Sequence, residues 1–302
     1  MSIKNIGVIG HGFIGQEVVK ELIKKTKNKI KIMDRNSNVF NLPVSWYKAD
    51  FRNKKAVSDF IEDIDILIHL ASSTVPASST LSAENDIKEN ISAMIQILDL
   101  AREINPKLYV IFASSASVYG NQKKLPITEL NLPQPISFHG LQKLSIEHFL
   151  RIYYQKYNIN YATCRISNPY GFGQKKNTGQ GLISIIKDSL INNKKIQIFG
   201  LEECTRDFIH ISDLAKAFVA LCENEYINCE VNISSGIETR IDNLIENIEK
   251  ICKKNIVADF KELRQVDIKR SVLDNTLIKS LTKWRPTKSL EDGIAEYMKS
   301  PE

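Results

Sequence analysis

The sequence has no long hydrophobic run and only five cysteines. None of its apolar stretches approaches the ~20 residues that a helix needs to cross a bilayer. The first residues are typical of a strand and not of a signal peptide. The cysteines are odd in number and form no CxxC pair, so we expect free thiols, no metal site and a reducing, cytoplasmic environment.

The sequence also lacks a concentrated basic stripe. Its net charge of +6 comes from 41 Lys and Arg against 35 Asp and Glu, but the lysines occur in short pairs scattered along the chain. A nucleic-acid-binding surface would gather them and interleave aromatic residues. Solvated surface charge and a positive cleft for a diphosphate explain the charge better, so no nucleic-acid partner is expected.

No repeat, low-complexity segment or evident flexible linker divides the 302 residues. The first half alternates short β-branched runs with helical patterns, which is typical of a parallel sheet with helices on its faces. The patterns predict strands at residues 6–9, 30–33, 64–70 and 108–114, and helices at 14–25, 84–102 and 140–157. The predicted class is α/β, a Rossmann doubly wound parallel sheet with a smaller α/β C-terminal lobe.

A glycine-rich turn, GHGFIG, follows the first predicted strand and opens the first helix. In this context Gly10 permits a tight turn, Gly12 lets the backbone approach a pyrophosphate, and Gly15 lets helix and strand pack closely. The N-terminus of the helix, at Phe13 and Ile14, offers N–H groups to the phosphates. The turn therefore predicts a dinucleotide site.

Asp34 closes the second predicted strand. A carboxylate there accepts hydrogen bonds from the adenosine ribose hydroxyls and repels a 2′-phosphate. NAD is therefore the predicted cofactor, in preference to NADP, although the neighbouring Arg35 could soften that preference.

Further motifs follow in order along essentially the whole chain. They are residues 49–52 (ADFR), 66–71 (ILIHLA), 112–120 (FASSASVYG), 165–171 (RISNPYG), 205–213 (TRDFIHISD) and 284–286 (WRP), with Leu290 and Gly293 closing the chain. In these motifs the chain resembles the extended short-chain dehydrogenases, the NAD-dependent epimerase/dehydratase family. One departure is the glycine loop, because the family usually has GxxGxxG and this chain the shorter GxGxxG.

The resemblance implies a site for each ligand. The residues expected at NAD are Gly10, Gly12, Phe13, Ile14, Gly15, Asp34, Asp50, Phe51, Leu70, Ala71, Asn90, Ser114 and Lys143. Those expected at a nucleoside-diphosphate sugar are Ser115, Asn168, Arg206, Arg264 and Asp267, with Val266 where the family usually has glycine.

The resemblance also implies an organisation into domains and subunits. A Rossmann domain is expected over residues 1–166, with 201–231 returning to it, and a nucleotide-sugar lobe over 167–200 and 232–302. The helices at 84–102 and 140–157 carry apolar residues beyond one stripe, and the equivalent helices pair between subunits in relatives. A homodimer is therefore expected.

In this family a Ser or Thr, a Tyr and a Lys four residues after it perform the proton transfer. Ser115 and Lys143 match, but His139 stands where the tyrosine is expected, and Gln142 where a serine is usual. At i and i+4 of a helix, His139 and Lys143 share one face. Three readings remain open: His139 is the acid/base, catalysis has been lost and the chain only binds nucleotide, or Tyr119 or His210 takes the role.

Dehydration is disfavoured, because the family's 4,6-dehydratases carry Thr-Asp-Glu where this chain has Ser115-Ala116-Ser117. What remains is redox chemistry at one carbinol, C4 of a nucleotide hexose being the usual one. An NAD-type pocket favours a nucleotide-sugar epimerase, in carbohydrate biosynthesis of the O-antigen or cell-surface polysaccharide kind. The alternatives are a 4-keto-sugar reductase or dehydrogenase and, from another class, a non-catalytic nucleotide-binding protein.

Overall fold

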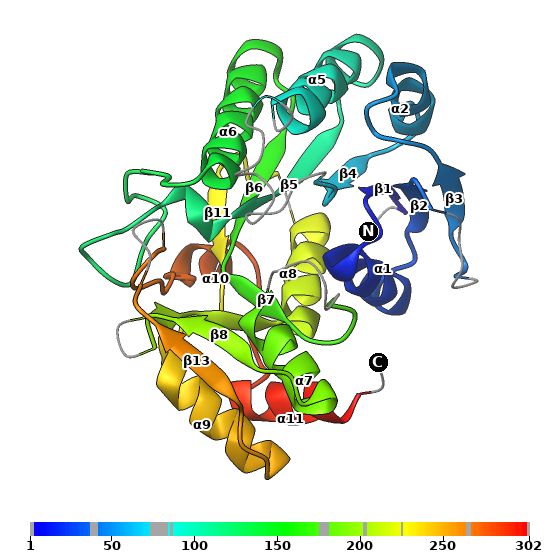
Figure 1. Cartoon of the computed structure of the whole chain (residues 1–302). Coiled ribbons are helices and arrows are strands. Elements are labelled where there is room, and N and C mark those ends of the chain that lie inside the picture. Colours follow the sequence, from blue (N-terminus) through cyan, green and yellow to red (C-terminus); the bar gives the residue numbers. More distant parts are fainter. Residues whose placement is uncertain are drawn as a thin grey trace.

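The computed structural model describes residues 3–36, 42–72, 84, 87–174, 181–201, 204–224, 226–263 and 267–300. At its centre is a parallel sheet of seven strands in the order β11-β6-β5-β4-β1-β2-β3 (Figure 1). These strands are β1 (Asn5–Ile9), β2 (Lys29–Asp34), β3 (Ser45–Lys48), β4 (Ile66–His69), β5 (Tyr109–Ser115), β6 (Tyr161–Ile166) and β11 (Glu230–Ile233). Strand order runs outward from β1 in both directions, which is the doubly wound arrangement that the sequence predicts.

Helices cover both faces of this sheet (Figure 1). α1 (Phe13–Lys25) and α8 (Ile211–Glu223) pack on one face, and α2 (Lys54–Ile61), α5 (Ser92–Ile104) and α6 (Phe138–Tyr157) on the other. Along β1, Ile6 and Val8 enter the first core and Ile9 the second. Successive side chains of a strand point to opposite faces, so a strand covered on both sides is apolar throughout.

The predicted helices are present, with shifted ends. α6 begins at Phe138, ahead of the predicted start, because the Ser137 hydroxyl accepts a hydrogen bond from the Gly140 N–H at 3.1 Å and caps the first turn. It ends at Tyr157, and the next residue, Asn158, has a left-handed backbone. The helix predicted at 84–102 contains a π-helical turn, η1 (Ile87–Ile91), immediately before α5. Residues 85–86 lie outside the described part of the chain.

A smaller lobe with its own core lies below the sheet in Figure 1. Its core is built from Ile186, Leu244 and Ile294, among others. The remaining elements of the chain are η2 (Ala116–Val118), β7 (Asn168–Tyr170), α7 (Leu182–Asn192), β8 (Ile196–Phe199), β9 (Thr205–Arg206), β10 (Phe208–His210), β12 (Thr239–Arg240), α9 (Ile241–Cys252), β13 (Ala258–Lys261), α10 (Thr276–Leu281) and α11 (Leu290–Lys299). The strands among these elements form three two-stranded sheets. β7 pairs with β10 and β8 with β13 in parallel, and β9 pairs with β12 antiparallel.

After the first elements of the lobe, the chain returns to the central sheet. α8 packs against α1, and β11 pairs with β6 through Ile233. α10 also contacts β11. The predicted domain boundaries stay a prediction. Across the described residues, no helix combines the length and apolar character needed to cross a membrane.

Candidate active site

The glycine loop lies where β1 meets α1, at the carboxyl edge of the sheet. Gly10 has φ +98°, and a Cβ there would lie 2.7 Å from the backbone nitrogen of Ala71. A Cβ at Gly15 would lie 2.1 Å from the Gly10 carbonyl oxygen, whereas one at Gly12 would meet no atom of the described chain within 4 Å. Gly10 and Gly15 are thus needed for packing, and Gly12 borders the open space that a pyrophosphate requires.

Asp34 reaches from the end of β2 to this loop. Its carboxylate accepts hydrogen bonds from the His11 N–H at 2.7 Å and from the Asn36 N–H at 2.8 Å. The Trp46 ring meets the His11 ring edge to face at 5.1 Å. Asp34 therefore ties the glycine loop to the carboxyl end of β2, and its binding of the adenosine ribose stays a prediction.

Asp50 and Phe51, which the sequence predicts at the adenine, follow β3. Arg52 donates to both carboxylate oxygens of Asp50, at 2.9 and 2.7 Å, and this hydrogen bonding lowers the pKa of Asp50. Arg52 also pairs with Glu89 at 3.1 Å. The sequence reading missed Arg52, although a cation two residues from the aspartate was a visible signal. Phe51 is buried against the His69 ring.

The other residues expected at the cofactor lie in several structural settings. The backbone N–H groups of Leu70 and Ala71 both donate to the Ile9 carbonyl oxygen at 2.9 Å, which closes β4 against β1. Asn90 is buried in η1. The Ser114 hydroxyl donates to the Glu147 carboxylate at 2.5 Å. In this geometry the Ser114 side chain supports α6.

Lys143 lies in the first half of α6 and is buried. Its ammonium group donates to the Ala113 carbonyl oxygen at 2.8 Å and stands 4.7 Å from the centre of the Phe112 ring. Burial lowers the pKa of Lys143 to about 8, and the Glu147 carboxylate opposes that shift. The ammonium group is thus fixed at the end of β5.

His139 is one turn before Lys143 and is buried, with 8% of its surface exposed. Burial and, next, the Lys143 charge lower the pKa of His139 to about 3. The imidazole is therefore neutral at physiological pH, with one ring nitrogen unprotonated, and the same shift makes it a weaker base than an ordinary histidine.

Ser115 sits beside the start of α6. It caps η2, with its hydroxyl oxygen accepting from the Ser117 N–H at 3.2 Å and from the Ser117 hydroxyl at 3.0 Å. A Cβ at Gly140 would lie 2.5 Å from the Ser117 carbonyl oxygen, so the first turn of α6 can approach η2 only because residue 140 is glycine. This close approach brings Ser115 and His139 to one region, and Ser117 joins them as a hydroxyl that the sequence reading did not select.

Tyr119 and His210, the two alternative proton carriers, have other partners. The Tyr119 hydroxyl donates to the Asn232 side-chain oxygen at 2.7 Å, and burial raises the pKa of Tyr119 to about 12. His210 Nδ1 bonds the Ser212 hydroxyl at 2.7 Å at the start of α8, and its ring packs against Tyr170. These contacts favour His139 over both.

A buried ion pair supports α6 from behind. Arg165 on β6 donates to the Glu147 carboxylate at 2.7 Å, and Arg165 also donates to the Tyr119 hydroxyl at 3.0 Å. Both charged side chains are at most 3% exposed. Glu147 lies four positions after Lys143 on the same helix. The pair fixes the helix that carries His139 and Lys143.

Three residues expected at the sugar nucleotide line one pocket of about 250 Å³ in the lobe: Asn168, Arg206 and Asp267. The Asn168 side chain donates to the Asp207 carbonyl oxygen at 3.0 Å, and the Arg206 guanidinium group donates to the Thr205 carbonyl oxygen at 2.8 Å. Arg264 lies outside the described residues.

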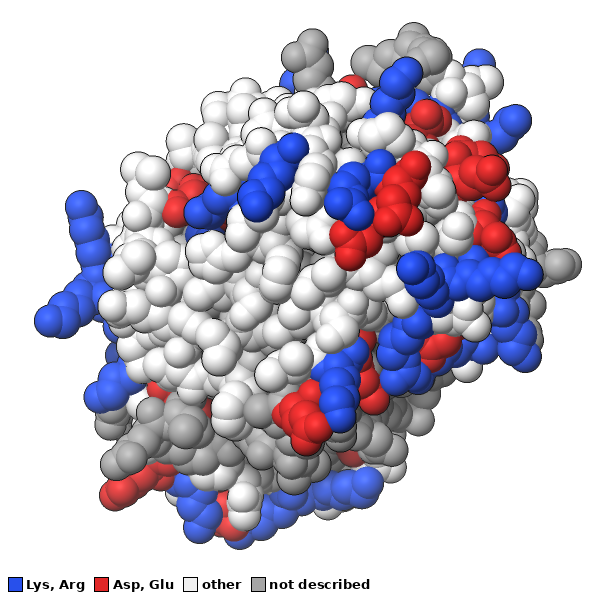
Figure 2. Space-filling model, turned by 90° about the horizontal axis from the view of Figure 1, so that it is seen from above, with Lys and Arg blue, Asp and Glu red and all other residues white. Residues whose placement is uncertain are grey.

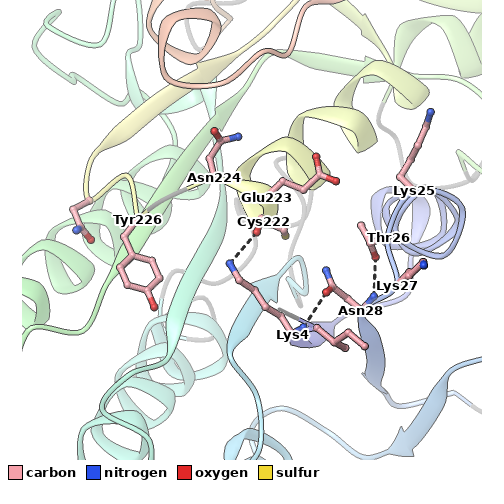
Figure 3. A pocket seen from close by; sticks show the side chains of 11 residues that line it. Lys4, Lys25, Thr26, Lys27, Asn28, Cys222, Glu223, Asn224 and Tyr226 are labelled. Atoms are coloured by element: carbon pink, nitrogen blue, oxygen red, sulfur yellow. Dashed lines mark hydrogen bonds between the residues drawn. The ribbon is translucent and has the colours of Figure 1, made fainter. Parts of the chain in front are cut away.

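A larger cavity of about 820 Å³ opens at the opposite, amino edge of the sheet (Figure 3). Lys4 donates there to the Cys222 carbonyl oxygen at 3.3 Å, and Asn28 accepts from the Lys4 N–H. Open α/β sheets bind their ligands at the carboxyl ends of the strands, so this cavity is not the candidate site. The described residues hold no cluster of His, Cys, Asp and Glu suited to a metal ion.

The sheet, the glycine loop and the carboxylate at the end of β2 define a Rossmann-type dinucleotide-binding protein. The sequence profile of the NAD dependent epimerase/dehydratase family matches residues 6–234, and the chain belongs to this family. The predicted fold, family, enzyme class and cofactor, NAD, are confirmed.

Individual relatives agree with this assignment. The chain is 32% identical to a Methanocaldococcus jannaschii protein assigned as a UDP-glucose 4-epimerase, over 94% of both chains. It is 31% identical to an Escherichia coli dTDP-4-dehydro-6-deoxyglucose reductase, over 96% of this chain and 95% of the other. The crystal structure of Thermotoga maritima UDP-glucose 4-epimerase with UDP-glucose superposes with a TM-score of 0.89 at 28% identity, covering 97% of each chain.

Proposed function

We propose that the protein is an NAD-dependent nucleotide-sugar epimerase that acts at a single carbinol, C4 of a nucleoside-diphosphate hexose. The observation that carries this proposal is the buried, neutral His139 one helical turn from Lys143, on the first turn of α6, which packs against the η2 turn that Ser115 caps. The names of its relatives, UDP-glucose 4-epimerases among them, support the substrate class.

In the proposed reaction His139 accepts the proton of the C4 hydroxyl group. Ser115 holds the reacting oxygen, and Ser117 orients the Ser115 hydroxyl through the contact at 3.0 Å. When bound, NAD supplies the acceptor for the hydride that leaves the same carbon and the donor that returns it. After the 4-keto sugar turns its other face, His139 gives the proton back to the oxygen. Lys143 orients the nicotinamide ribose, and burial together with the Lys143 charge keeps His139 unprotonated before each turnover.

The sugar nucleotide is proposed to bind across the pocket in the lobe. Arg206 and Arg264 would neutralise the diphosphate, Asn168 would donate to it, and Asp267 would accept from the nucleoside ribose. Arg206 and Asn168 line the same pocket as Asp267, which supports a common ligand.

A second candidate, net reduction of a 4-keto sugar, is favoured by the similarity to the Escherichia coli dTDP-4-dehydro-6-deoxyglucose reductase. The two reactions differ in whether NADH is consumed. Purified protein is tested in two assays, one with NAD and a panel of UDP-, GDP-, CDP- and dTDP-sugars and one with NADH and the matching 4-keto sugars. Proton NMR of the sugars and absorbance of NADH are the readouts. A C4 epimer formed without net NADH supports the epimerase. Stoichiometric NADH consumption with a 4-keto sugar identifies a reductase, and no turnover with any sugar leaves the nucleotide-binding protein.

We further propose that the protein is a homodimer assembled through α5 and α6. Figure 2 shows the molecule from the side of these helices, where a broad area carries no Lys, Arg, Asp or Glu. Four apolar residues of α6 are about half exposed: Phe138, Leu141, Ile152 and Tyr157. A second copy of the chain would remove this surface from water.

The proposed cellular setting is the cytoplasm, in the synthesis of O-antigen or another cell-surface polysaccharide. The described cysteines are all free thiols, which fits a reducing compartment.

A further inference from the structure

Gln142 is a buried amide at a position that the proposed reaction leaves without a role. It lies on α6 immediately before Lys143, with 3% of its surface exposed. Neither its Nε2 nor its Oε1 has a hydrogen-bond partner among the described residues. Burying an amide without a hydrogen-bond partner destabilises the folded protein. We therefore expect Gln142 to gain a partner when the enzyme has its ligands bound.

His139 also has a buried polar atom without a hydrogen-bond partner. Its Nδ1 is enclosed and has no partner within the described chain, whereas Nε2 is not among the enclosed atoms. His139 and Gln142 are i and i+3 on one helix, a spacing at which side chains are neighbours. The helical spacing therefore makes these two buried side chains neighbours, and the structure shows no hydrogen bond between their polar groups.

The residues around this pair limit what His139 Nδ1 can bond. Lys143, the charged neighbour on the same helix, offers only donors, and its ammonium group already donates to the Ala113 carbonyl oxygen. A glutamine offers an acceptor and no charge. A carboxylate in its place would attract the Lys143 ammonium group and stabilise a protonated imidazole.

We propose that Gln142 is a positioning residue that fixes the tautomer of His139. Its side-chain oxygen accepts the Nδ1 proton in the NAD-bound enzyme, so that Nε2 carries the lone pair and faces the substrate hydroxyl. The inference rests on the proposed role of His139, and it explains why the residue before Lys143 departs from the family's serine together with the change from tyrosine to histidine.

The tautomer can be measured without any turnover. The full chain, labelled with ¹⁵N-histidine and saturated with NAD, is studied by NMR at pH 8, and His139 is assigned from the signal lost in His139→Asn. We expect the Nδ1–H tautomer in the unmodified protein and a shift toward Nε2–H in Gln142→Met. Gln155→Met, the same exchange at an exposed position of α6, is the control and should leave the tautomer unchanged.

Kinetics supply a second, independent readout. We expect Gln142→Met to lower kcat about tenfold with the KM of the sugar nucleotide little changed, as for the loss of one hydrogen bond. Gln142→Glu retains an acceptor and should keep the Nδ1–H tautomer. Its carboxylate raises the pKa of His139, so the fall of kcat/KM on the acid side should move to higher pH.

An unchanged tautomer in folded, NAD-bound Gln142→Met would overturn the inference. So would a loss of NAD affinity without a tautomer change, because Gln142 would then contact the cofactor. Should Gln142→Met fail to fold, an Nε2–H tautomer in Gln142→Glu, which retains an acceptor, would overturn it as well. The proposed function fails differently, through an active His139→Ala or an inactive parent protein, and neither outcome alters the tautomer measurement.

Discussion

His139 and Lys143 lie one turn apart on α6, and both side chains are buried, with 8% and 6% of their surfaces exposed. Burial and the lysine charge together keep the imidazole neutral. We expect His139→Ala to abolish turnover and to leave NAD affinity nearly intact, which steady-state kinetics and calorimetry measure. His139→Tyr restores the family arrangement beside Lys143 and should retain activity. Full turnover in His139→Ala would pass the role to Tyr119, His210 or water.

The pH dependence of kcat/KM should reflect the lowered pKa of His139. A base works only when unprotonated, so kcat/KM falls as the pH drops through the pKa of the free enzyme's imidazole. Since the pKa of His139 is lowered from 6.5 to about 3, the rate should stay level as the pH falls through 6.5. A rate that halves near pH 6.5 in the unmodified protein, and no longer does so in His139→Tyr, would contradict the lowered pKa of His139.

His69 makes folding stability depend on pH. It is 3% exposed on β4, and burial, aided by Lys143, lowers its pKa to about 3. Below pH 6.5 the unfolded chain binds a proton that the folded chain does not, so stability is lost as the pH falls. Between pH 7 and pH 5, we expect the free energy of unfolding of His69→Phe to fall by about 2 kcal/mol less than that of the parent protein, as measured by urea unfolding. His148→Asn, which removes an exposed imidazole, is the control and should match the parent.

The Glu147–Arg165 pair should be costly to break on one side only. Arg165→Met leaves the Glu147 carboxylate buried without its partner, and we expect a loss of about 3–5 kcal/mol in unfolding free energy. Arg240→Met, at the half-exposed pair with Asp242, should cost at most about 1 kcal/mol. Adding Glu147→Leu to Arg165→Met should cost less than the two single losses combined. Strict additivity in denaturant titrations would show that the two charges do not depend on each other.

Asp34 should set the choice of cofactor. The carboxylate at the end of β2 would face a 2′-phosphate, so we expect NAD(H) to bind at least several-fold more tightly than NADP(H), by titration calorimetry. Asp34→Asn keeps the size of the side chain and removes its charge. It should reduce the ratio of NAD(H) affinity to NADP(H) affinity. Asp59→Asn, an exposed carboxylate on α2, should leave it unchanged. Equal or reversed affinities in the parent protein would refute the assignment.

The proposed dimer can be broken at α6. Ile152 is 43% exposed, and an arginine there would place a charge in the interface. We expect light scattering at micromolar concentration to show a dimer for the parent and a monomer for Ile152→Arg. Val257→Arg, at an apolar residue exposed in the lobe, should remain dimeric. A monomeric parent would end the proposal.

Much of the fold follows from short-range patterns in the sequence. The β-branched runs and the helical spacing between them predict the doubly wound sheet, because each element must bury a stripe or a face. The glycine turn and Asp34 predict the dinucleotide site, because their roles depend on backbone geometry within a few residues of a strand end. The order of the motifs also points to the family, and even the exchange of tyrosine for histidine is visible at position 139.

Only the tertiary structure decides how these residues are held. It places Tyr119 in a buried network with Arg165 and Asn232, which distant segments supply, so its motif alone could not tell packing from catalysis. It shows the Ser114 hydroxyl donating a hydrogen bond to the Glu147 carboxylate, whereas the motif predicted that Ser114 contacts the cofactor. It encloses Gln142 and His139 Nδ1 away from solvent, and burial is a property of the packed chain. Burial and long-range partners set a side chain's charge and hydrogen bonds, and local spacing in the sequence contains neither.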